Sequence, residues 1–356
     1  MSTTPMDLDT MTQTLESRLA GRGAAADVLD GGGDPLGSVR PELDRLEAHL
    51  TNDEGIEFPV VAELLRYVFK AGGKRLRPSL VFLAARLGSE RVDPDRVRDL
   101  AAAVETLHTA TLVHDDLVDG SLLRRGLPTL NVRWSAGATV LAGDWLFARA
   151  AAFAADTENV AVMKIFARTL GTLTNGELRQ LFGRDGVPTD EEYAYRIYAK
   201  TASLFEASTE AAGALVGLSA EQVAALATYG RELGNAFQVV DDLLDFTGDP
   251  ERLGKPVGSD LRSGQVTLPV MRHLARHPDA ASWLHSGGGR AVESADEHEV
   301  AALVEAVRSD TVALEETRVA ARDHIGRALG ALDVLPAVEA TRGLARIARY
   351  AIARDV

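Results

Sequence analysis

Two short acidic patterns contain the residue types best able to do chemistry in this sequence. Asp115, Asp116 and Asp119 form the first, and the same DDxxD spacing returns at Asp241, Asp242 and Asp245. Residues one, three and four positions apart lie on one side of a helix, so each pattern can present its carboxylates together. Oxygen ligands at such short spacing are typical of Mg²⁺, which keeps coordination positions for water and phosphate oxygens. A solvated acidic helix end explains one such cluster equally well, and the second copy favours the metal site.

Basic residues accompany both acidic clusters. The segment from Gly72 to Arg77 reads GGKRLR, Arg124 and Arg125 follow the first cluster, and Lys255 follows the second. A glycine pair lets the backbone approach a phosphate, while Lys74 offers a point charge and Arg77 a planar fork. A basic helix start on the surface is the simpler interpretation of this segment. Fixed cations beside two acidic clusters favour a diphosphate clamp instead.

From roughly Pro41 to the C-terminus, this combination of motifs resembles the trans-isoprenyl diphosphate synthases, the family also called polyprenyl synthetases. The resemblance implies head-to-tail transfer of an allylic prenyl group onto isopentenyl diphosphate, in a homodimer. It also implies about two or three Mg²⁺ ions per site, with Mn²⁺ as a substitute. The metals then promote loss of the allylic diphosphate, and the double bond of isopentenyl diphosphate attacks the resulting carbocation.

The resemblance also assigns a role to each candidate site residue. It implies metal binding by Asp115, Asp116, Asp119, Asp241, Asp242 and Asp245. It places the allylic diphosphate on Arg124, Lys200, Thr201, Gln238 and Lys255, and isopentenyl diphosphate on Lys74, Arg77, His108 and Arg125. The residues expected to be catalytic are Asp115, Asp116, Asp119, Arg124, Lys200, Asp241 and Asp242. Gln265 departs from the family pattern, which has a second lysine there, and puts that contact in doubt.

Long helices are needed to position these residues. Apolar repeats without helix breakers run from Asp95 to Val118, from Tyr193 to Val216 and from Ala220 to Phe246, and these segments contain the first cluster, Lys200 and the second cluster. A further helix is expected from Glu297 to Leu329. Because no segment shows convincing strand alternation, we predict an all-α, isoprenoid synthase-type bundle of about ten or more helices around a central apolar cavity.

Composition restricts the organisation and the partners of the chain. Residues 1–40 lack sustained periodicity and are expected to be a flexible N-terminal leader, followed by a single helical domain over residues 41–356. The net charge of −14 argues against nucleic acid as a partner, and the absence of cysteine favours the cytoplasm. Asp144 and Arg149 make the apolar stretch from Trp134 to Ala155 a core helix rather than a transmembrane segment. A peripheral membrane contact during product release is a further expectation.

Other functions were weighed against the synthase interpretation. A class I terpene cyclase has the same fold and paired acidic clusters, but it has no use for the second diphosphate site of Lys74, Arg77 and Arg125. A non-catalytic subunit of a heteromeric synthase usually loses one acidic cluster, and both are intact here. A helical interaction protein would contain the duplicate clusters only by accident. A short-chain geranylgeranyl or farnesyl diphosphate synthase is the alternative that the motifs leave open.

The residues before Asp115 help to distinguish a long-chain from a short-chain synthase. Short-chain family members have bulky aromatic residues four or five positions earlier, where this chain has Thr111 and Ala110. Further back the helix passes Leu107, Thr106, Ala103 and Ala102, each turn adding about 5.4 Å of depth. These mostly small side chains predict an open tunnel and a product of about six to nine isoprene units.

Overall fold

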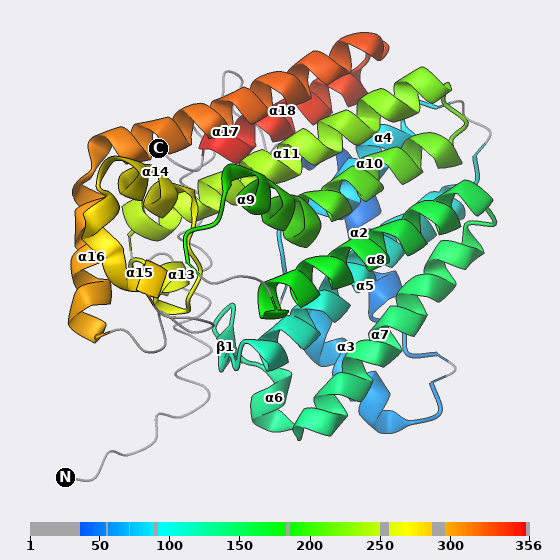
Figure 1. The fold of residues 1–356 in the computed structure, drawn as a ribbon. Helices are drawn as coiled ribbons and strands as arrows, with labels where there is room; N and C mark the ends of the chain where they lie inside the picture. Colours follow the sequence, from blue (N-terminus) through cyan, green and yellow to red (C-terminus); the bar gives the residue numbers. More distant parts are fainter. Residues whose placement is uncertain are drawn as a thin grey trace.

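The computed structural model describes residues 36–353 except 55, 71, 89–91, 183–185, 250–255 and 287–295. Within these residues the protein is almost entirely helical, as predicted, and its long helices lie side by side (Figure 1). The helices are α2 (Arg40–Leu50), α3 (Pro59–Lys70), α4 (Leu76–Ala85), α5 (Pro94–Val118), α6 (Leu130–Arg133), α7 (Ala136–Asp156), α8 (Val160–Phe182), α9 (Asp190–Ile197), α10 (Ser203–Leu215), α11 (Ala220–Thr247), α13 (Ser259–Arg262), α14 (Leu268–Arg276), α15 (Ser282–Ser286), α16 (Glu297–Ser309), α17 (Thr311–Ala331) and α18 (Glu339–Ala353).

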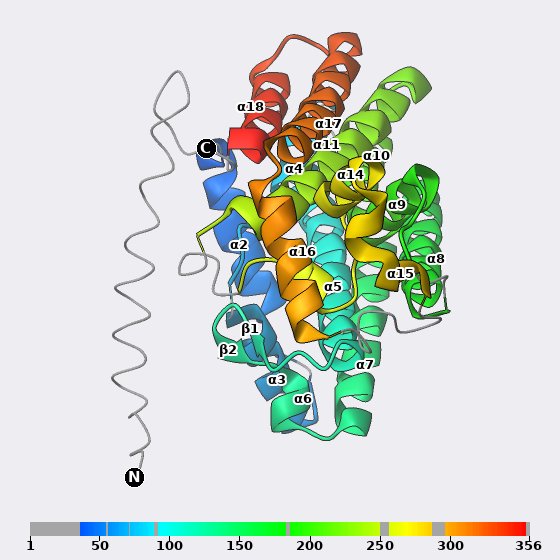
Figure 2. The ribbon, with the colours of Figure 1, turned by 60° about the vertical axis from the view of Figure 1, so that its left-hand side comes forward.

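Helix α5 is the central element of the bundle. It begins with a proline after Asp93, whose side chain accepts a hydrogen bond from the backbone of Asp95. Helices α2, α4, α7 and α10 pack around it (Figure 2). The approach of α7 is close, because a Cβ atom at Gly143 would lie 2.1 Å from the ring of His114. The first acidic cluster therefore sits at the end of a helix that neighbours hold on several sides.

Helix α11 positions the second acidic cluster. It begins at a capping box formed by Ser219 and Gln222, and it packs against α10 and α17. Its neighbour α9 continues into α10 through a π-helical turn at Tyr198–Ala202, so the helix predicted from Tyr193 to Val216 has a bulge in its middle. One-turn π-bulges inside α-helices are frequent at functional sites. This bulge contains Lys200 and Thr201.

Two strands of two residues form a hairpin just after the first acidic cluster, although the sequence predicted no strand. Strand β1 (Leu123–Arg124) pairs antiparallel with β2 (Leu127–Pro128). The two turn residues both have positive φ, 54° at Arg125 and 82° at Gly126. This is the backbone of a tight hairpin turn, and two-residue strands are too short to show an alternating pattern. The hairpin fixes both arginines next to the end of α5.

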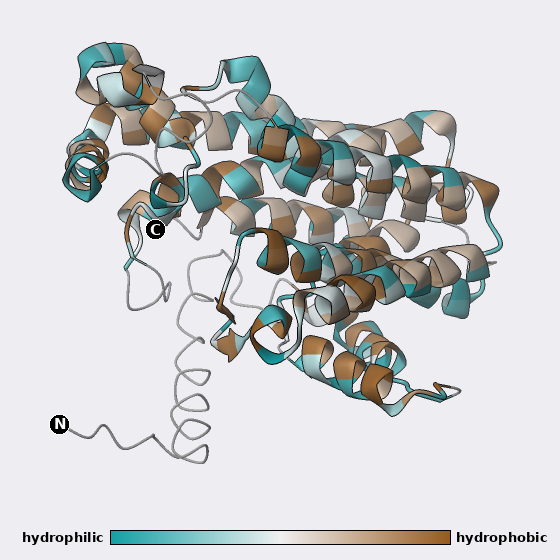
Figure 3. Ribbon diagram, turned by 60° about the horizontal axis from the view of Figure 1, so that its bottom comes forward, coloured by the Kyte–Doolittle hydropathy of each residue, from teal (hydrophilic) through white to brown (hydrophobic). Residues whose placement is uncertain are grey.

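Hydrophobic residues fill two connected parts of the bundle. The larger core surrounds α5 and includes residues of α4, α7, α8 and α10. The smaller core lies where the end of α11 meets α13, α14 and α16. Hydrophobic and hydrophilic residues alternate around many helices in Figure 3, as expected for amphipathic helices with one buried side.

The boundary predicted for the N-terminal leader needs a correction. Leu36 and Val39 are buried in the large core, and a 3₁₀ turn at Gly37–Val39 leads directly into α2. These last residues of the predicted leader therefore belong to the folded part, because they cover the apolar side of α2. Residues 1–35 lie outside the described residues, and the single-domain interpretation stays a prediction.

Helix α7 is the one described helix that is long and apolar enough to cross a membrane. Core helices of water-soluble proteins have the same length and composition, and 39% of its most apolar window is buried here. It packs along α5 and presents Asp144 on its exposed side. These features agree with the predicted core helix.

The contact between α11 and α17 contains a charged cluster that generates a stability prediction. Glu232 lies 2.7 Å from Nδ1 of His324 and accepts a 2.8 Å hydrogen bond from Nε of Arg327. Burial alone would raise the pKa of Glu232, but the hydrogen bonds from His324 and Arg327 outweigh it and lower the pKa to about 2. A carboxylate with a lowered pKa stabilises the fold above its unfolded pKa, and that contribution is lost as pH falls through the folded pKa.

We expect Glu232→Gln to lower the free energy of unfolding by about 1–2 kcal/mol at pH 7, a range that allows for the exposure of Arg327. The difference from the wild type should shrink as the pH falls from about 4.5 to about 2. Urea unfolding at pH 7, 4 and 3 measures it. Glu315→Gln, which removes an exposed ion pair to Arg322 on α17, should change little at any pH. A pH-independent loss in Glu232→Gln would contradict the electrostatic explanation.

Candidate active site

A pocket opens where the C-terminal end of α5 meets the hairpin; its empty volume, open solvent included, is about 620 Å³. Its walls include Glu105, His108 and Asp116 of α5, and Arg124 and Arg125 of the hairpin. Residues predicted from two separate motifs thus share one cavity. Most of its lining is apolar, and Arg124 and Arg125 of the hairpin could hold an anion there.

The three aspartates of the first cluster have different surroundings. Asp115 is half-buried, and burial raises its pKa to about 7; nearby Lys200 opposes this rise, while Glu177 and Asp119 add to it. Asp116 is 6% exposed, and Nε of Arg124 donates to both of its oxygens at 2.8 and 2.9 Å. Asp119 is exposed at the helix end.

This arrangement fits a divalent cation. Burial is the main cause of the raised pKa of Asp115, and the charges of Glu177 and Asp119 add to it; a bound cation would favour the charged form of this carboxyl group. All the donors are oxygens, as Mg²⁺ prefers. Glu177 of α8 was not predicted from the sequence, because it belongs to none of the motifs described above. It lies 3.5 Å from Nζ of Lys200 and therefore belongs to the same charged group.

The second cluster is divided among three environments. Asp241 is half-exposed, and its charge acts on Arg77. Asp242 is buried, and burial raises its pKa to about 7 although it accepts two hydrogen bonds. Asp245 is 1% exposed and accepts from the hydroxyl of Ser259 at 2.7 Å and from the backbone N–H of Asp260 at 3.1 Å. Asp241 is therefore the member whose charge acts on the basic group, whereas Asp245 ties α11 to α13.

Three arginines and a histidine gather beside the acidic residues. Burial, then the charges of Arg77 and Arg125, hold the pKa of His108 well below its usual range, so its imidazole is neutral at pH 7. Burial lowers the pKa of Arg77 to about 10, with Arg125 adding to the effect while Glu105 opposes it. Nε of Arg77 is buried without a hydrogen-bond partner. An incoming anion would relieve both the repulsion and the missing contact.

The remaining basic residues of the GGKRLR segment differ in role. Arg75 is 7% exposed and forms ion pairs with Glu47, at 2.5 Å, and with Glu105, so its charge is already used within the fold. Lys74 is exposed at the edge, with Nζ 5.6 Å from the ring centre of Tyr350. Gly73 touches the clamp directly, since a Cβ atom there would lie 2.9 Å from Nη1 of Arg125.

Three of the residues predicted around the allylic diphosphate, Lys200, Thr201 and Gln238, meet at the π-turn, whereas Arg124 lies on the hairpin. Oγ1 of Thr201 donates to Oε1 of Gln238 at 2.8 Å, and Nε2 of Gln238 donates to Asp242 at 2.9 Å. Lys200 lies on the same turn and faces Asp115 and Glu177. Lys255 falls outside the described residues.

Tyr193 is a further member of this group that the sequence analysis did not single out. Its hydroxyl donates to Oδ2 of Asp242 at 2.8 Å. It lies seven residues before Lys200, which corresponds to two helical turns and so to one helix side. That spacing is the signal that could have found it.

A second, apolar pocket lies deeper in the bundle, between α5, α8 and α10; its empty volume, open space included, is about 280 Å³. Leu107, Ala103, Val104 and Leu100 form the α5 wall, which confirms the predicted central cavity. Thr106 and Ala102 were expected on this wall and are not among its residues, because they lie on another side of the helix. From Asp115 to Leu100 the helix spans about 22 Å.

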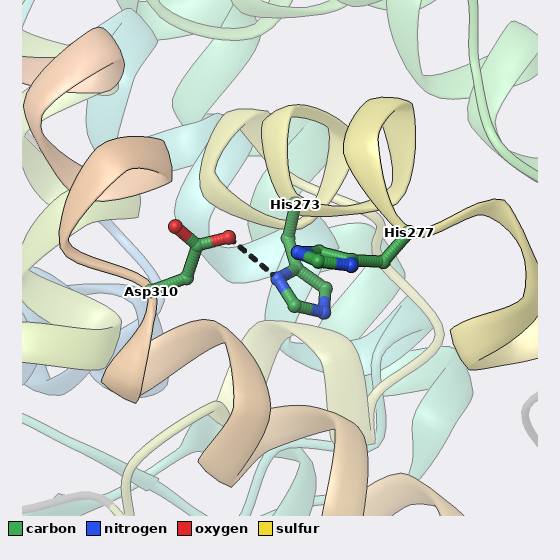
Figure 4. Close-up of side chains that lie close together, drawn as sticks. All are labelled: His273, His277 and Asp310. Carbon is green, nitrogen blue, oxygen red and sulfur yellow. Dashed lines mark hydrogen bonds and ion pairs between the residues drawn. The ribbon is translucent and has the colours of Figure 1, made fainter.

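A cluster of His273, His277 and Asp310 lies outside the cavities, where α14 meets the start of α17 (Figure 4). Their donor atoms lie within 4.8 Å of one another, as a metal site requires. One oxygen of Asp310, however, accepts from two backbone N–H groups at the start of α17, and the other contacts His273 at 2.7 Å and Arg276 at 2.9 Å. The arginine supplies the positive charge already, so we assign this cluster to helix capping.

Comparisons with known proteins agree with the resemblance. Residues 58–307 match the sequence profile of the family described as Polyprenyl synthetase. Octaprenyl diphosphate synthase of Escherichia coli strain K12 is 38% identical over 83% of this chain and 90% of its own length. Heptaprenyl diphosphate synthase component 2 of Geobacillus stearothermophilus is 37% identical over 90% of this chain and 96% of its own length.

Among solved structures, a decaprenyl diphosphate synthase from Rhodobacter capsulatus superposes with a TM-score of 0.82 at 36% identity, covering 90% of this chain and 98% of its own. A polyprenyl synthase from Caulobacter crescentus CB15, described as complexed with calcium and isoprenyl diphosphate, gives a TM-score of 0.77 at 34% identity and covers both chains completely, 100% of each. The predicted all-α fold is thereby confirmed. The chain belongs to the polyprenyl synthetase family.

Proposed function

We propose that the protein is a Mg²⁺-dependent trans-prenyltransferase that condenses isopentenyl diphosphate with an allylic diphosphate, giving a polyprenyl diphosphate longer than C20. The observation that carries the proposal is the juxtaposition of neighbouring carboxyl groups, a buried arginine nitrogen without a hydrogen-bond partner and an apolar pocket. The long-chain relatives, named octaprenyl, heptaprenyl and decaprenyl diphosphate synthases, support the product class.

The protein binds and orients two diphosphates in this proposal. Arg124, Lys200, Thr201 and Gln238 hold the allylic diphosphate near the aspartates, together with Lys255. Arg77, His108 and Arg125 hold isopentenyl diphosphate, with the exposed Lys74 at the rim. The neutral imidazole of His108 suits a hydrogen bond to a phosphate oxygen between two guanidinium groups.

Asp115 and Asp119 of the first cluster and Asp241 of the second are the proposed principal metal ligands. Asp116 becomes a ligand when Arg124 leaves it for the diphosphate. Bound metal ions would withdraw electrons from the diphosphate and so make it a better leaving group. Asp242 and Asp245 lie toward other side chains, and we revise their role from metal ligands to supports of Asp241.

The apolar cavity receives the growing tail and excludes water from the cationic reaction centre. Its lining is apolar apart from Thr169, so its described residues offer no strong base. The released pyrophosphate is therefore the proposed acceptor of the final proton.

We further propose that two copies of the chain associate and act in the cytoplasm. Leu141 of α7 and Val160 of α8 are 69% and 71% exposed, which would place apolar side chains in contact with water in a monomer. Peripheral membrane contact during product release stays a prediction.

The metal proposal predicts that Asp115→Ala and Asp241→Ala lower kcat by about a hundredfold or more, because each removes a ligand of the ion that activates the leaving group. The fold should survive, since like charges are being removed. Initial rates with labelled isopentenyl diphosphate, with and without EDTA and added Mg²⁺, measure the effect. Asp323→Ala, an exposed acid on α17, is the control. Near-normal rates in Asp115→Ala would sink the mechanism.

The two hairpin arginines should act on different substrates. Arg124→Ala is expected to raise KM for the allylic diphosphate, and Arg125→Ala to raise KM for isopentenyl diphosphate, each by about ten- to a hundredfold for a lost charged hydrogen bond. Separate substrate titrations measure both constants. If both variants weaken the same substrate, the assignment of the two subsites is wrong.

Tunnel depth should determine product length. The wild type is expected to make products of about six to nine isoprene units. Ala110→Phe should shorten them sharply while leaving the first condensation nearly unchanged. Ala103→Phe, about 10 Å deeper on the same helix side, should shorten them less. Chromatography of the labelled products measures their chain lengths. An unchanged distribution of chain lengths in both variants would show that the growing tail takes another path.

A further inference from the structure

A line of side-chain hydrogen bonds connects the π-turn to the second acidic cluster. Thr201 donates to Gln238 at 2.8 Å, Gln238 donates to one oxygen of Asp242 at 2.9 Å, and Tyr193 donates to the other oxygen at 2.8 Å. The participants come from α9, the π-turn and α11. Both oxygens of Asp242 are therefore directed by neutral donors from outside its own turn.

We propose that Tyr193 is a positioning residue of the active site: by holding Asp242 against α9, it determines which carboxylate of the second cluster faces the bound metal. Asp241 and Asp242 are consecutive, so their side chains leave α11 about 100° apart. With Asp242 held toward α9, the neighbouring Asp241, whose charge acts on Arg77, is the carboxylate that we assign to the metal. Without the tyrosine hydroxyl, the carboxylate of Asp242 can turn and disturb that arrangement. The inference rests on the proposed function.

The surroundings of Tyr193 hold its hydroxyl in a defined place. The residue is 5% exposed and follows a capping box at Thr189 that starts α9. The guanidinium of Arg196 lies 5.5 Å from the centre of its ring and donates to the backbone carbonyl of Val266 at 2.5 Å. A phenylalanine would fill the same space without offering a donor.

Tyr193 could instead be an ordinary core tyrosine whose hydroxyl merely finds a partner. Tyr229 shows what that looks like in the same protein. It is completely buried on α11, and its hydroxyl donates to the backbone carbonyl of Leu344 at 2.7 Å. Loss of that hydroxyl removes a buried hydrogen bond and leaves both acidic clusters untouched. Tyr229→Phe is therefore the matched control for Tyr193→Phe.

The test compares the two variants by equilibrium binding and by rate. Thermal unfolding is followed while Mg²⁺ is titrated at fixed inorganic pyrophosphate, which reports metal binding without turnover. We expect Tyr193→Phe to raise the half-saturating Mg²⁺ concentration about three- to tenfold and to lower kcat, with KM for isopentenyl diphosphate unchanged. Tyr229→Phe should lower the melting temperature and leave the Mg²⁺ titration as in the wild type.

Equal Mg²⁺ titrations for Tyr193→Phe and the wild type would overturn the positioning role. If Tyr193→Phe does not fold, Gln238→Met removes the other donor to Asp242. Because Gln238 is also assigned to the diphosphate, its Mg²⁺ titration is run at saturating pyrophosphate, and an unchanged titration would refute the inference. A wild-type protein that binds Mg²⁺ and pyrophosphate but transfers no prenyl group would refute the proposed function alone, since the titration tests the positioning role by itself.

Discussion

Charge crowding at the end of α5 is the constraint on which the rest of the structure depends. Glu105 and Asp116 of α5 share one pocket with Arg75, Arg124 and Arg125, and burial weakens the hydration of the nearby Arg77 and Asp115. The negative and positive side chains neutralise each other only in part. Arg124 neutralises Asp116, and Arg75 neutralises Glu105, while Asp115 and Arg77 keep pKa values shifted by burial. A site in this state gains stability when ions of both signs bind together.

The helices hold these charges in place because most of their surface packs against neighbouring helices. Helices α2, α4, α6, α7 and α10 pack against α5, and α11 lies between α10 and α17. The less regular segments are the ones that aim side chains: the π-turn at Lys200, the hairpin turn at Arg125, and the start of α13 that receives Asp245. The regular helices form a rigid framework, and the interruptions between them determine where the side chains of the site point.

The sequence predicted the helices, the two acidic clusters and most of the basic group, because apolar periodicity and spacing are local properties. It could not predict that Asp241, Asp242 and Asp245 face different partners, since Tyr193 and Ser259 reach them from distant segments. The single helix expected from Glu297 to Leu329 is in fact two helices, divided at Asp310, which caps α17. The sequence did not reveal this division because no proline or glycine occurs there. Thr106 and Ala102 were wrongly expected on the wall of the apolar pocket. Their distance along α5 was considered, but not the side of the helix to which each residue points.

The contact between Gly73 and Arg125 has a consequence for how such sequences can change. The two residues are far apart in the chain, yet a Cβ atom at position 73 would lie 2.9 Å from the guanidinium at position 125. A larger residue at position 73 therefore pushes the end of the Arg125 side chain aside, whereas a smaller residue at position 125 leaves Gly73 undisturbed. The dependence runs in one direction: the small size of residue 73 leaves space for the guanidinium group that a distant part of the chain places beside it.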